Sequence, residues 1–599
     1  MTPTRPRYKG SRRKLVLAFD VGTTYSGISY SILDPGQVPE IKSVTRYPAH
    51  EQISGASKIP TIIYYDRRGT ARAIGAEAMR EGIYEIAEEE AWIKAEWFKL
   101  HLRANGYASQ NITDNIPPLP LNKAVVEVIS DFLRYLLKCA SSYIRDTHAN
   151  GADLWDSVER EIHFVLSHPN GWEGREQSQM RRAAVLAGLI TDTDSGHLRL
   201  SFVTEGEASL HFSIHNGLPS SAMEDGEGIV VVDAGGGTID LSAYKRGRGA
   251  DKKFSEISVP QCHFHGSIFV TIRARQFLER YLAESPFLDD LNHIIECFDK
   301  TTKLKFQNID GPQYIKFGST RDNDPACNIR FGQLKLAGSD VAPFFQPSVD
   351  CIVKAVLEQK TSASKPVSHV VLVGGFASSD WLFTKVHEAL TPHGLNVLRP
   401  ENHLSKAVSD GAISFHLDHH VTTRVSKFAY GTFSRIAYDP TDPEHQKRES
   451  TLAMSASGEK RVGGVFHTIL PKNTPVSEVK EFRRVNHQRS DKKSTFKRLT
   501  TTLVCYRGAK TNTTKMWRDI EPDMYTKICS IEMDLSHLPL VAQPRLNGEP
   551  GMFYEIEYET VLMFGLTELK AQIAWKENGV EKRSTARIVY EPEAQPGRG

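Results

Sequence analysis

Residues 18–26, AFDVGTTYS, constrain the fold of this chain more than any other stretch, because they place a carboxylate at the start of a tight glycine turn. The apolar residues 15–19 predict a short buried strand that ends at Asp20. Gly22 lets the backbone approach an oxygen-rich ligand closely. Backbone N–H groups and hydroxyls that can donate to phosphate follow at Thr23, Thr24 and Tyr25. Asp20 cannot bind phosphate itself, but it can hold a hydrated Mg²⁺ that bridges to phosphate. Taken alone, the segment fits a simple strand and Gly-Thr turn about as well.

The same pattern returns at 229–241, IVVVDAGGGTIDL, where an apolar run ends in Asp233 and a glycine turn. The residues of this second turn are Gly235, Gly236, Gly237 and Thr238. A third turn, Gly374 and Gly375, follows the apolar run of VVLVGGF at 370–376. The chain has no P-loop motif and no G-x-G-x-x-G that opens a helix, which disfavours two common nucleotide folds. Three strand-turn motifs, two of them led by aspartate, predict a phosphate site built from several strand ends.

The order of these three motifs resembles the 70-kilodalton heat-shock chaperones and the wider actin-like, ribonuclease-H-like ATPases. The Thr-Thr-Tyr-Ser ending of the first motif favours the chaperone branch over sugar kinases and actin. The resemblance covers residues 15–415 well and the remainder poorly. It implies ATP or ADP with Mg²⁺ as cofactors, and unfolded client proteins and co-chaperones as partners.

Strands that alternate with helices predict an α/β fold, with a β-rich C-terminal region. Amphipathic or turn-bounded patterns indicate helices at 77–102, 123–143, 173–188, 267–282, 344–359 and 381–390. Two similar halves imply two lobes that face a cleft, with ligand at the carboxyl ends of the strands. We therefore expect a disordered basic tail at 1–14, ATPase lobe I at 15–226, lobe II at 227–416 and a β-rich, substrate-binding-like region at 417–599.

In the last region, apolar and acidic residues alternate at 554–559, which is typical of a half-exposed strand. Residues 569–590 predict a hairpin around Asn578-Gly579. The basic stretch 483–498 is interpreted as a solvated, flexible loop rather than a nucleic-acid site.

Composition excludes several classes of protein. Lys and Arg number 74 against 72 Asp and Glu, so the overall charge gives no reason to expect a nucleic-acid partner. No apolar run is long enough for a membrane span, and the basic residues before 15 lack the apolar segment of a signal peptide. The seven cysteines are dispersed, as expected for reduced thiols in the cytoplasm or the nucleus.

The resemblance also assigns the chemistry of the site. Asp20 and Asp233 would hold Mg²⁺ through water, and the first two glycine turns would cradle the β- and γ-phosphates. Lys99, in EWFKLHL, matches the family's catalytic lysine, and Glu205 is preferred to Glu207 as the residue that orients the attacking water. The residues expected to act in catalysis are thus Lys99, Glu205, Asp233 and Thr238. On the nucleoside side, the matches are Lys303, Gly374 and Gly375.

Three departures from the family pattern stand beside these matches. Ser378 replaces the arginine that stacks on adenine, which puts base selectivity in doubt. The segment 413–425, ISFHLDHHVTTRV, is histidine-rich where the family has a leucine-rich linker. The resemblance finds no counterpart of the helical lid, so a lidless, divergent member is expected.

The leading expectation is an ATP-binding, slowly hydrolysing chaperone of the 70-kilodalton heat-shock type, that is, a Mg-dependent ATPase. Two alternatives stay open: a nucleotide-gated interaction or scaffold protein with little or no ATP turnover, and a small-molecule kinase on the same fold. The kinase is disfavoured because Lys99 and Glu205 fit a site that directs water.

Overall fold

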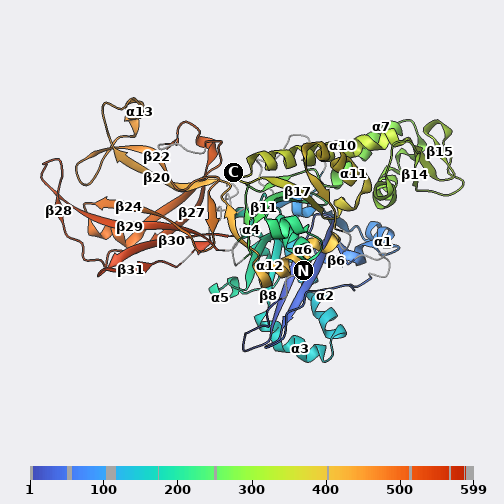
Figure 1. Cartoon of the computed structure of the whole chain (residues 1–599), viewed down its shortest axis with the longest axis horizontal. Helices are drawn as coiled ribbons and strands as arrows, with labels where there is room; N and C mark the ends of the chain where they lie inside the picture. The colour runs from blue at the N-terminus through green and yellow to red at the C-terminus, as the bar shows by residue number, and fades with distance from the viewer. Residues whose placement is uncertain are drawn as a thin grey trace. The chain divides into compact units, whose positions relative to one another are not determined.

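The computed structural model describes two compact units (Figure 1). Unit 1 consists of Met1–Trp172 and Gln179–Val421, and unit 2 of Glu173–Ser178 and Thr422–Gly599. The described residues are 5–49, 57–102, 116–172, 174–248, 252–400, 404–510, 516–565, 568–585 and 587–588. Within these ranges, no helix combines the length and the apolar character needed to cross a membrane.

The first sheet of unit 1 is built on the strand that precedes the first glycine turn. β1 (Lys14–Val21) pairs antiparallel with β2 (Tyr25–Leu33) and parallel with β8 (His163–His168), and β8 pairs parallel with β9 (Leu200–Thr204). The apolar side chains of β1 share one core with those of helix α2 (Val125–Thr147). The sheet is therefore packed against α2 through a shared core, and its first turn lies at the end of a buried strand.

The second sheet repeats this plan. β10 (Gly228–Ala234) pairs antiparallel with β11 (Ile239–Arg246) across the second glycine turn, and parallel with β17 (Val367–Val373). β17 in turn pairs parallel with β18 (Asn396–Leu398). The core against this sheet is supplied by helices α7 (Ile268–Tyr281), α10 (Gly338–Ser362) and α11 (Asp380–Leu390). The third glycine turn follows β17, so the second and third turns lie at the ends of neighbouring parallel strands.

Two helices join the sheets of unit 1. α6 (Glu205–His215) packs against β10 and β11, α12 (Ala407–Asp418) packs against β1 and β2, and the two helices pack on each other. Their approach is close, because a Cβ atom on Gly411 would overlap the backbone carbonyl of Ala208. α6 and α12 thus fix the two sheets relative to each other.

Most predicted helices are confirmed, since α2, α4 (Gly174–Leu186), α7 and α11 occupy the expected stretches. α10 begins at Gly338 instead of 344, because Pro343 lies within the helix and does not mark its start. Pro347 also lies within it.

The helix predicted at 77–102 is wrong. The stretch contains helix α1 (Ile83–Glu89), strand β7 (Ile93–Glu96) and a 3₁₀ helix, Phe98–Leu102. Left-handed backbone at Ala91 and Trp97 separates these elements, at φ of 49° and 53°. A continuous helix cannot pass through such residues. β7 pairs with β5 (Ile62–Tyr65), which also pairs with β6 (Ala71–Ile74).

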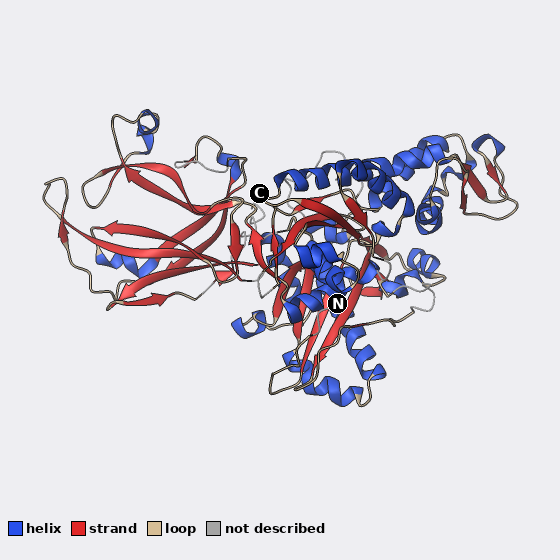
Figure 2. Ribbon diagram, in the orientation of Figure 1, coloured by secondary structure: helices blue, strands red, loops and turns tan. Residues whose placement is uncertain are grey.

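Unit 2 is mainly β-structure (Figure 2). One sheet contains β20 (Ala429–Ala437), β22 (Lys460–Leu470), β25 (Leu499–Tyr506) and β27 (Tyr525–Met533). Another contains β24 (Glu481–Ser490), β29 (Met552–Gly565), β30 (Glu568–Glu577) and β31 (Val580–Arg583). Buried side chains of both sheets, such as Leu503 and Leu562, form one core. The hairpin around Asn578-Gly579 joins β30 to β31, and both turn residues have positive φ.

The basic stretch 483–498 differs from its prediction as a loop. Its first half lies in β24, which pairs antiparallel with the acidic strand β29, and its second half includes a 3₁₀ helix, Lys493–Arg498. Arg483 and Arg489 contact glutamates of β29, at 2.9 Å from Glu559 and 3.1 Å from Glu555. The stretch reads as loop-like because its charges obscure the strand alternation, but Arg483 and Arg489 are paired across the sheet.

Candidate functional site

The first two glycine turns, far apart in sequence, meet in unit 1. A Cβ atom on Gly236 would overlap the hydroxyl of Thr24, and one on Gly237 would overlap the hydroxyl of Thr23. Both positions therefore require glycine for the turns to come this close. The structure thus brings together the β1–β2 turn, with Gly22 and Tyr25, and the β10–β11 turn, with Gly235 and Thr238.

The third turn meets the second at its aspartate. Gly374 has φ of 92°, a left-handed conformation, and a Cβ atom there would overlap Oδ1 of Asp233. A Cβ atom on Gly375 would contact nothing within 4 Å, so this residue borders open space. Glycine 374 is needed both for its backbone angle and for the approach of the carboxylate.

Lys99 and Glu205 form a buried ion pair, with 2.6 Å between Nζ and Oε1. Lys99 comes from the 3₁₀ helix after β7, and Glu205 is the first residue of α6. Burial alone would lower the pKa of Lys99, but the carboxylates of Glu205, Asp20 and Asp240 outweigh it and raise that pKa. The ammonium also lies over the ring of Trp172, 5.3 Å from its centroid. Lys99 is therefore held charged in a site shielded from water.

Asp20 has two partners that the sequence did not suggest. Lys58 Nζ lies 2.6 Å from Asp20 Oδ2, and Ser167 Oγ donates to Oδ1 at 2.9 Å. Lys58 precedes β4 (Ile59–Pro60), which pairs with β2, and Ser167 is part of β8. The first aspartate is thus oriented from two sides.

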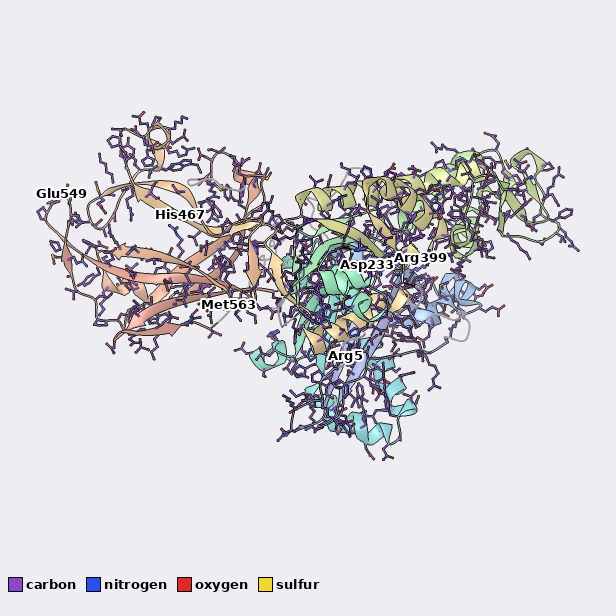
Figure 3. All side chains as sticks on the ribbon, in the orientation of Figure 1. Arg5, Asp233, Arg399, His467, Glu549 and Met563 are labelled. Carbon is purple, nitrogen blue, oxygen red and sulfur yellow. The ribbon has the colours of Figure 1, made fainter. Side chains whose placement is uncertain are left out.

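Asp233 lies opposite Asp240 in the β10–β11 ladder. Ser209 Oγ donates to Asp233 at 3.1 Å, and the backbone N–H of Asn170 donates to Asp240 at 2.6 Å. Burial raises the pKa of Asp233, and the carboxylates of Glu205, Asp240 and Asp20 raise it further. Burial and then Glu205 raise the pKa of Asp240 to about 7. Figure 3 labels Asp233 within unit 1.

Acidic charge exceeds basic charge in this group, which we name the carboxylate cluster: Asp20, Glu205, Asp233 and Asp240, with Lys58 and Lys99. All four carboxylates are at most 8% exposed. Two ammonium groups cannot neutralise four carboxylates, and uncompensated buried carboxylates are costly. Oxygen donors with an excess of negative charge fit a hard divalent cation such as Mg²⁺.

The spacing of the carboxylates favours a hydrated ion. Among the described residues, the only group of three possible metal ligands within 4.8 Å of one another lies elsewhere, at His215, Asp418 and His420. Asp20 and Asp233 are therefore suited to contact Mg²⁺ through its waters, since this ion usually keeps several of them.

Of the predicted nucleoside residues, Gly374 borders Asp233, whereas Lys303 lies on a separate element. Lys303, in the short helix Lys303–Lys305, forms an ion pair with Asp299 and donates to Thr271 Oγ1 at 3.2 Å. Neither Asp299 nor Thr271 belongs to the carboxylate cluster. Ser378 donates to the carbonyl oxygen of Gly375 at 2.6 Å, so it closes its own turn.

Lys58, Ser167, Asn170 and Asp240 were missed from the sequence. Asp240 had a usable signal, because it ends the second motif, GGGTID, and the strand pairing around a hairpin turn sets it opposite Asp233. Lys58, Ser167 and Asn170 are isolated residues in unrelated segments, and only the fold brings them to the cluster.

No family model matches the chain. It is similar to heat shock 70 kDa protein 12A of Mus musculus and of Homo sapiens, each 24% identical over 506 residues that cover 70% of this chain and 71% of the relative. Heat shock 70 kDa protein 12B of Homo sapiens is 22% identical over 486 residues, which cover 67% of this chain and 68% of the relative. The predicted resemblance to a divergent heat-shock protein of the 70-kilodalton type is confirmed.

Proposed function

We propose that the chain binds Mg²⁺ and ATP and hydrolyses ATP slowly, as a divergent protein of the 70-kilodalton heat-shock type. The observation that carries this proposal is the meeting of two aspartate-led glycine turns beside a buried carboxylate cluster. Donors for phosphate and an excess of acidic charge for a divalent cation then lie in one place.

In this proposal the two sheets of unit 1 are the two ATPase lobes, 15–226 and 227–416. The turn at Gly22–Tyr25 contacts the phosphates from lobe I, and the turn at Gly235–Thr238 contacts them from lobe II. Backbone N–H groups and the hydroxyl of Thr238 donate to the phosphate oxygens. Asp20 and Asp233 hold Mg²⁺ through its waters. The bound ion supplies neutralisation of phosphate charge.

Lys99 and Glu205 position the nucleophile. Lys99 engages Oε1 of Glu205, which leaves Oε2 to accept a hydrogen bond from the attacking water. The ammonium is then aimed at the charge that develops on the transferred phosphoryl group. Because phosphoryl transfer requires mainly positioning and charge stabilisation, this fixed pair can supply most of what the protein must contribute.

The nucleoside contacts are proposed at Gly374, Gly375 and Lys303. The open space beside Gly375 suits a flat base or ribose. Ser378 offers no guanidinium plane for stacking, so we propose weaker selection of adenine than an arginine would give.

Single-turnover hydrolysis of ATP with Mg²⁺ tests the proposal. Lys99→Ala and Glu205→Ala should each abolish phosphate release while ATP binding persists. The surface pair Lys385–Glu388 is the matched control, with 2.8 Å between Nζ and Oε2 but side chains 35% and 56% exposed. Lys385→Ala and Glu388→Ala should release phosphate at the wild-type rate. Release of phosphate at the wild-type rate by all four variants would exclude hydrolysis at this site.

The second candidate is a nucleotide-gated scaffold that binds ATP without turnover. The contact between Lys58 and Asp20 favours it, because an ammonium there competes with the ion that Asp20 would hold. ATP binding by the wild type without any phosphate release would select this function. The small-molecule kinase remains a third, less favoured proposal, which transfer of phosphate to a sugar would support.

The β-rich region 417–599 is proposed to bind unfolded clients and to respond to co-chaperones. Suppression of client aggregation that changes with ATP would support chaperoning over scaffolding. The cysteines are all free thiols, which is in keeping with the proposed cytoplasmic or nuclear location.

A further inference from the structure

The histidine-rich segment after lobe II contributes to a second group of polar side chains in unit 1, distinct from the carboxylate cluster. His215 ends α6, Asp418 ends α12, and His420 follows two residues later. Because α6 and α12 pack together, their last turns bring these three side chains to one point. One ligand atom from each lies within 4.8 Å of the others.

The spacing is close to that of a tetrahedral metal site. The Nε2 atoms of His215 and His420 lie 3.5 Å and 3.8 Å from Oδ2 of Asp418. Ligands about 2.0 Å from a tetrahedral zinc ion are about 3.3 Å apart, so these two separations exceed the ideal value by only a few tenths of an ångström, and the third is within 4.8 Å. Two imidazoles and a carboxylate are a ligand set that suits zinc and related transition metals better than Mg²⁺.

Both imidazoles bring their Nε2 atoms close to the carboxylate of Asp418. His420 Nε2 is buried and makes no hydrogen bond with any of the described residues. His215 Nε2 lies 3.3 Å from Nη2 of Arg5, and a guanidinium can only donate, so this contact is a hydrogen bond in the tautomer that leaves Nε2 with a lone pair. The backbone adds to the preference for a cation, because the negative ends of two helix dipoles meet here.

Arg5 supplies that cation in the structure. Its Nε and Nη2 atoms each lie 2.9 Å from the carboxylate of Asp418, on Oδ1 and Oδ2 respectively. Figure 3 labels Arg5 in unit 1. The arm that carries it is attached through Tyr8, whose backbone exchanges hydrogen bonds with Gly36 and Gln37. Arg5 is therefore a tethered cation that contacts two of the three possible metal ligands.

We propose that His215, Asp418 and His420 form a binding site for a divalent transition metal such as Zn²⁺, and that Arg5 and the metal compete for it. A metal that enters must displace the guanidinium, and binding thereby releases the anchor of the N-terminal arm. The site is independent of the proposed ATPase chemistry, because it shares no residue with the carboxylate cluster.

Calorimetric titration of the full chain with Zn²⁺, in excess Mg²⁺ and without nucleotide, tests the proposal. Arg5→Ala should tighten Zn²⁺ binding by about 10- to 100-fold, the range that corresponds to loss of a competing charge-assisted contact. His420→Ala and His215→Ala should weaken it by at least about 10-fold, the least effect seen even for outer partners of a metal. His393→Ala, at an exposed histidine, should leave the affinity unchanged.

Co²⁺ in place of Zn²⁺ distinguishes this site from the seven cysteines, since thiolate ligands give intense near-ultraviolet bands that imidazole and carboxylate do not. A visible spectrum without those bands, lost in His420→Ala, is the expected result. The proposal is overturned if His215→Ala and His420→Ala bind Zn²⁺ as tightly as the wild type. It is also overturned if Arg5→Ala binds no more tightly, because competition would then be absent.

Discussion

Two groups of charged side chains, one in each unit, are built in opposite ways. The carboxylate cluster of unit 1 is buried and has more acidic than basic groups. On the β24–β29 sheet of unit 2, Arg483 contacts Glu481, Glu559 and Glu581, and every partner is partly exposed. The first group has fewer cations than carboxylates, whereas Arg483 in the second group is already surrounded by its counter-ions.

The pKa values follow this difference. In unit 1, burial and neighbouring carboxylates raise the pKa values of Asp233 and Asp240. In unit 2, hydrogen bonds from Arg483 and Arg583 lower the pKa of Glu581 to about 2. Two arginines of the conspicuous basic stretch, Arg483 and Arg489, are thus paired within their own sheet, while the acidic cluster retains unfavourable interactions that a bound cation would relieve. A ligand site is indicated by buried carboxylates that outnumber the neighbouring cations, and not by the density of charge in the sequence.

Removal of the buried ammonium gives the sharpest contrast between the two groups. Lys99→Met should lower the free energy of unfolding by about 3–5 kcal/mol, because it leaves Glu205 buried without its partner. The double variant Lys99→Met/Glu205→Gln should recover part of that loss. Urea unfolding measures both. A loss no larger than that of an exposed arginine would show that the cluster is hydrated, and the comparison would fail.

The contact between the two turns tests how the cluster is assembled. Gly236→Ala should cost up to about 3 kcal/mol and weaken ATP binding, because the new methyl group overlaps the side chain of Thr24. Thr24→Gly in the same chain should restore much of the stability. A double-mutant cycle measures this coupling. Additive costs would indicate that the turns do not touch.

The raised pKa of Asp240 predicts a specific dependence on pH. The folded state holds this proton up to about pH 7, whereas the unfolded state loses it near pH 4. The free energy of unfolding therefore falls as pH rises between those values, because deprotonation stabilises only the unfolded state. Asp240→Asn mimics the protonated form. Its stability relative to wild type should therefore rise by about 2 kcal/mol from about pH 5.5 to about pH 7.5.

Urea unfolding of both proteins at the two pH values provides the measurement, and the buried histidines cancel in the difference. Mg²⁺ with ATP should reduce the effect, since a bound cation lowers the pKa of the carboxylate. A difference that does not vary with pH would mean that Asp240 is ionised in the folded protein.

The sequence predicted the parts of the site that have local signatures. Each of the first two motifs, at 15–25 and 229–238, consists of a strand, an aspartate and a glycine turn in consecutive residues. Their structure therefore follows from short-range sterics and burial. Lys99 was proposed by resemblance, and its role stays a prediction. Its surroundings were wrongly predicted as helix because the residues that break the helix, Ala91 and Trp97, are not typical of left-handed backbone.

The remainder depends on contacts between distant segments. Lys58 reaches Asp20 only through the pairing of β4 with β2. Arg5 contacts Asp418 although 413 positions separate them in the sequence. Neither has a neighbour in sequence that indicates its partner. The pairing of Arg483 and Arg489 likewise requires the register of β24 on β29, which no single strand specifies.

The smallest expected effect comes from the exposed side of the comparison. Arg483→Gln should change the free energy of unfolding by less than about 1 kcal/mol, because its ion pairs are screened and partly solvated. Added salt should shrink even that difference, while it leaves the cost of Lys99→Met largely unchanged. Urea unfolding at low and high ionic strength separates the two behaviours. Because the arginine is already paired, the variant should also bind ATP as the wild type does. A large, salt-resistant loss for Arg483→Gln would instead place this sheet among the structurally essential charge networks, and exposure would no longer distinguish the two groups.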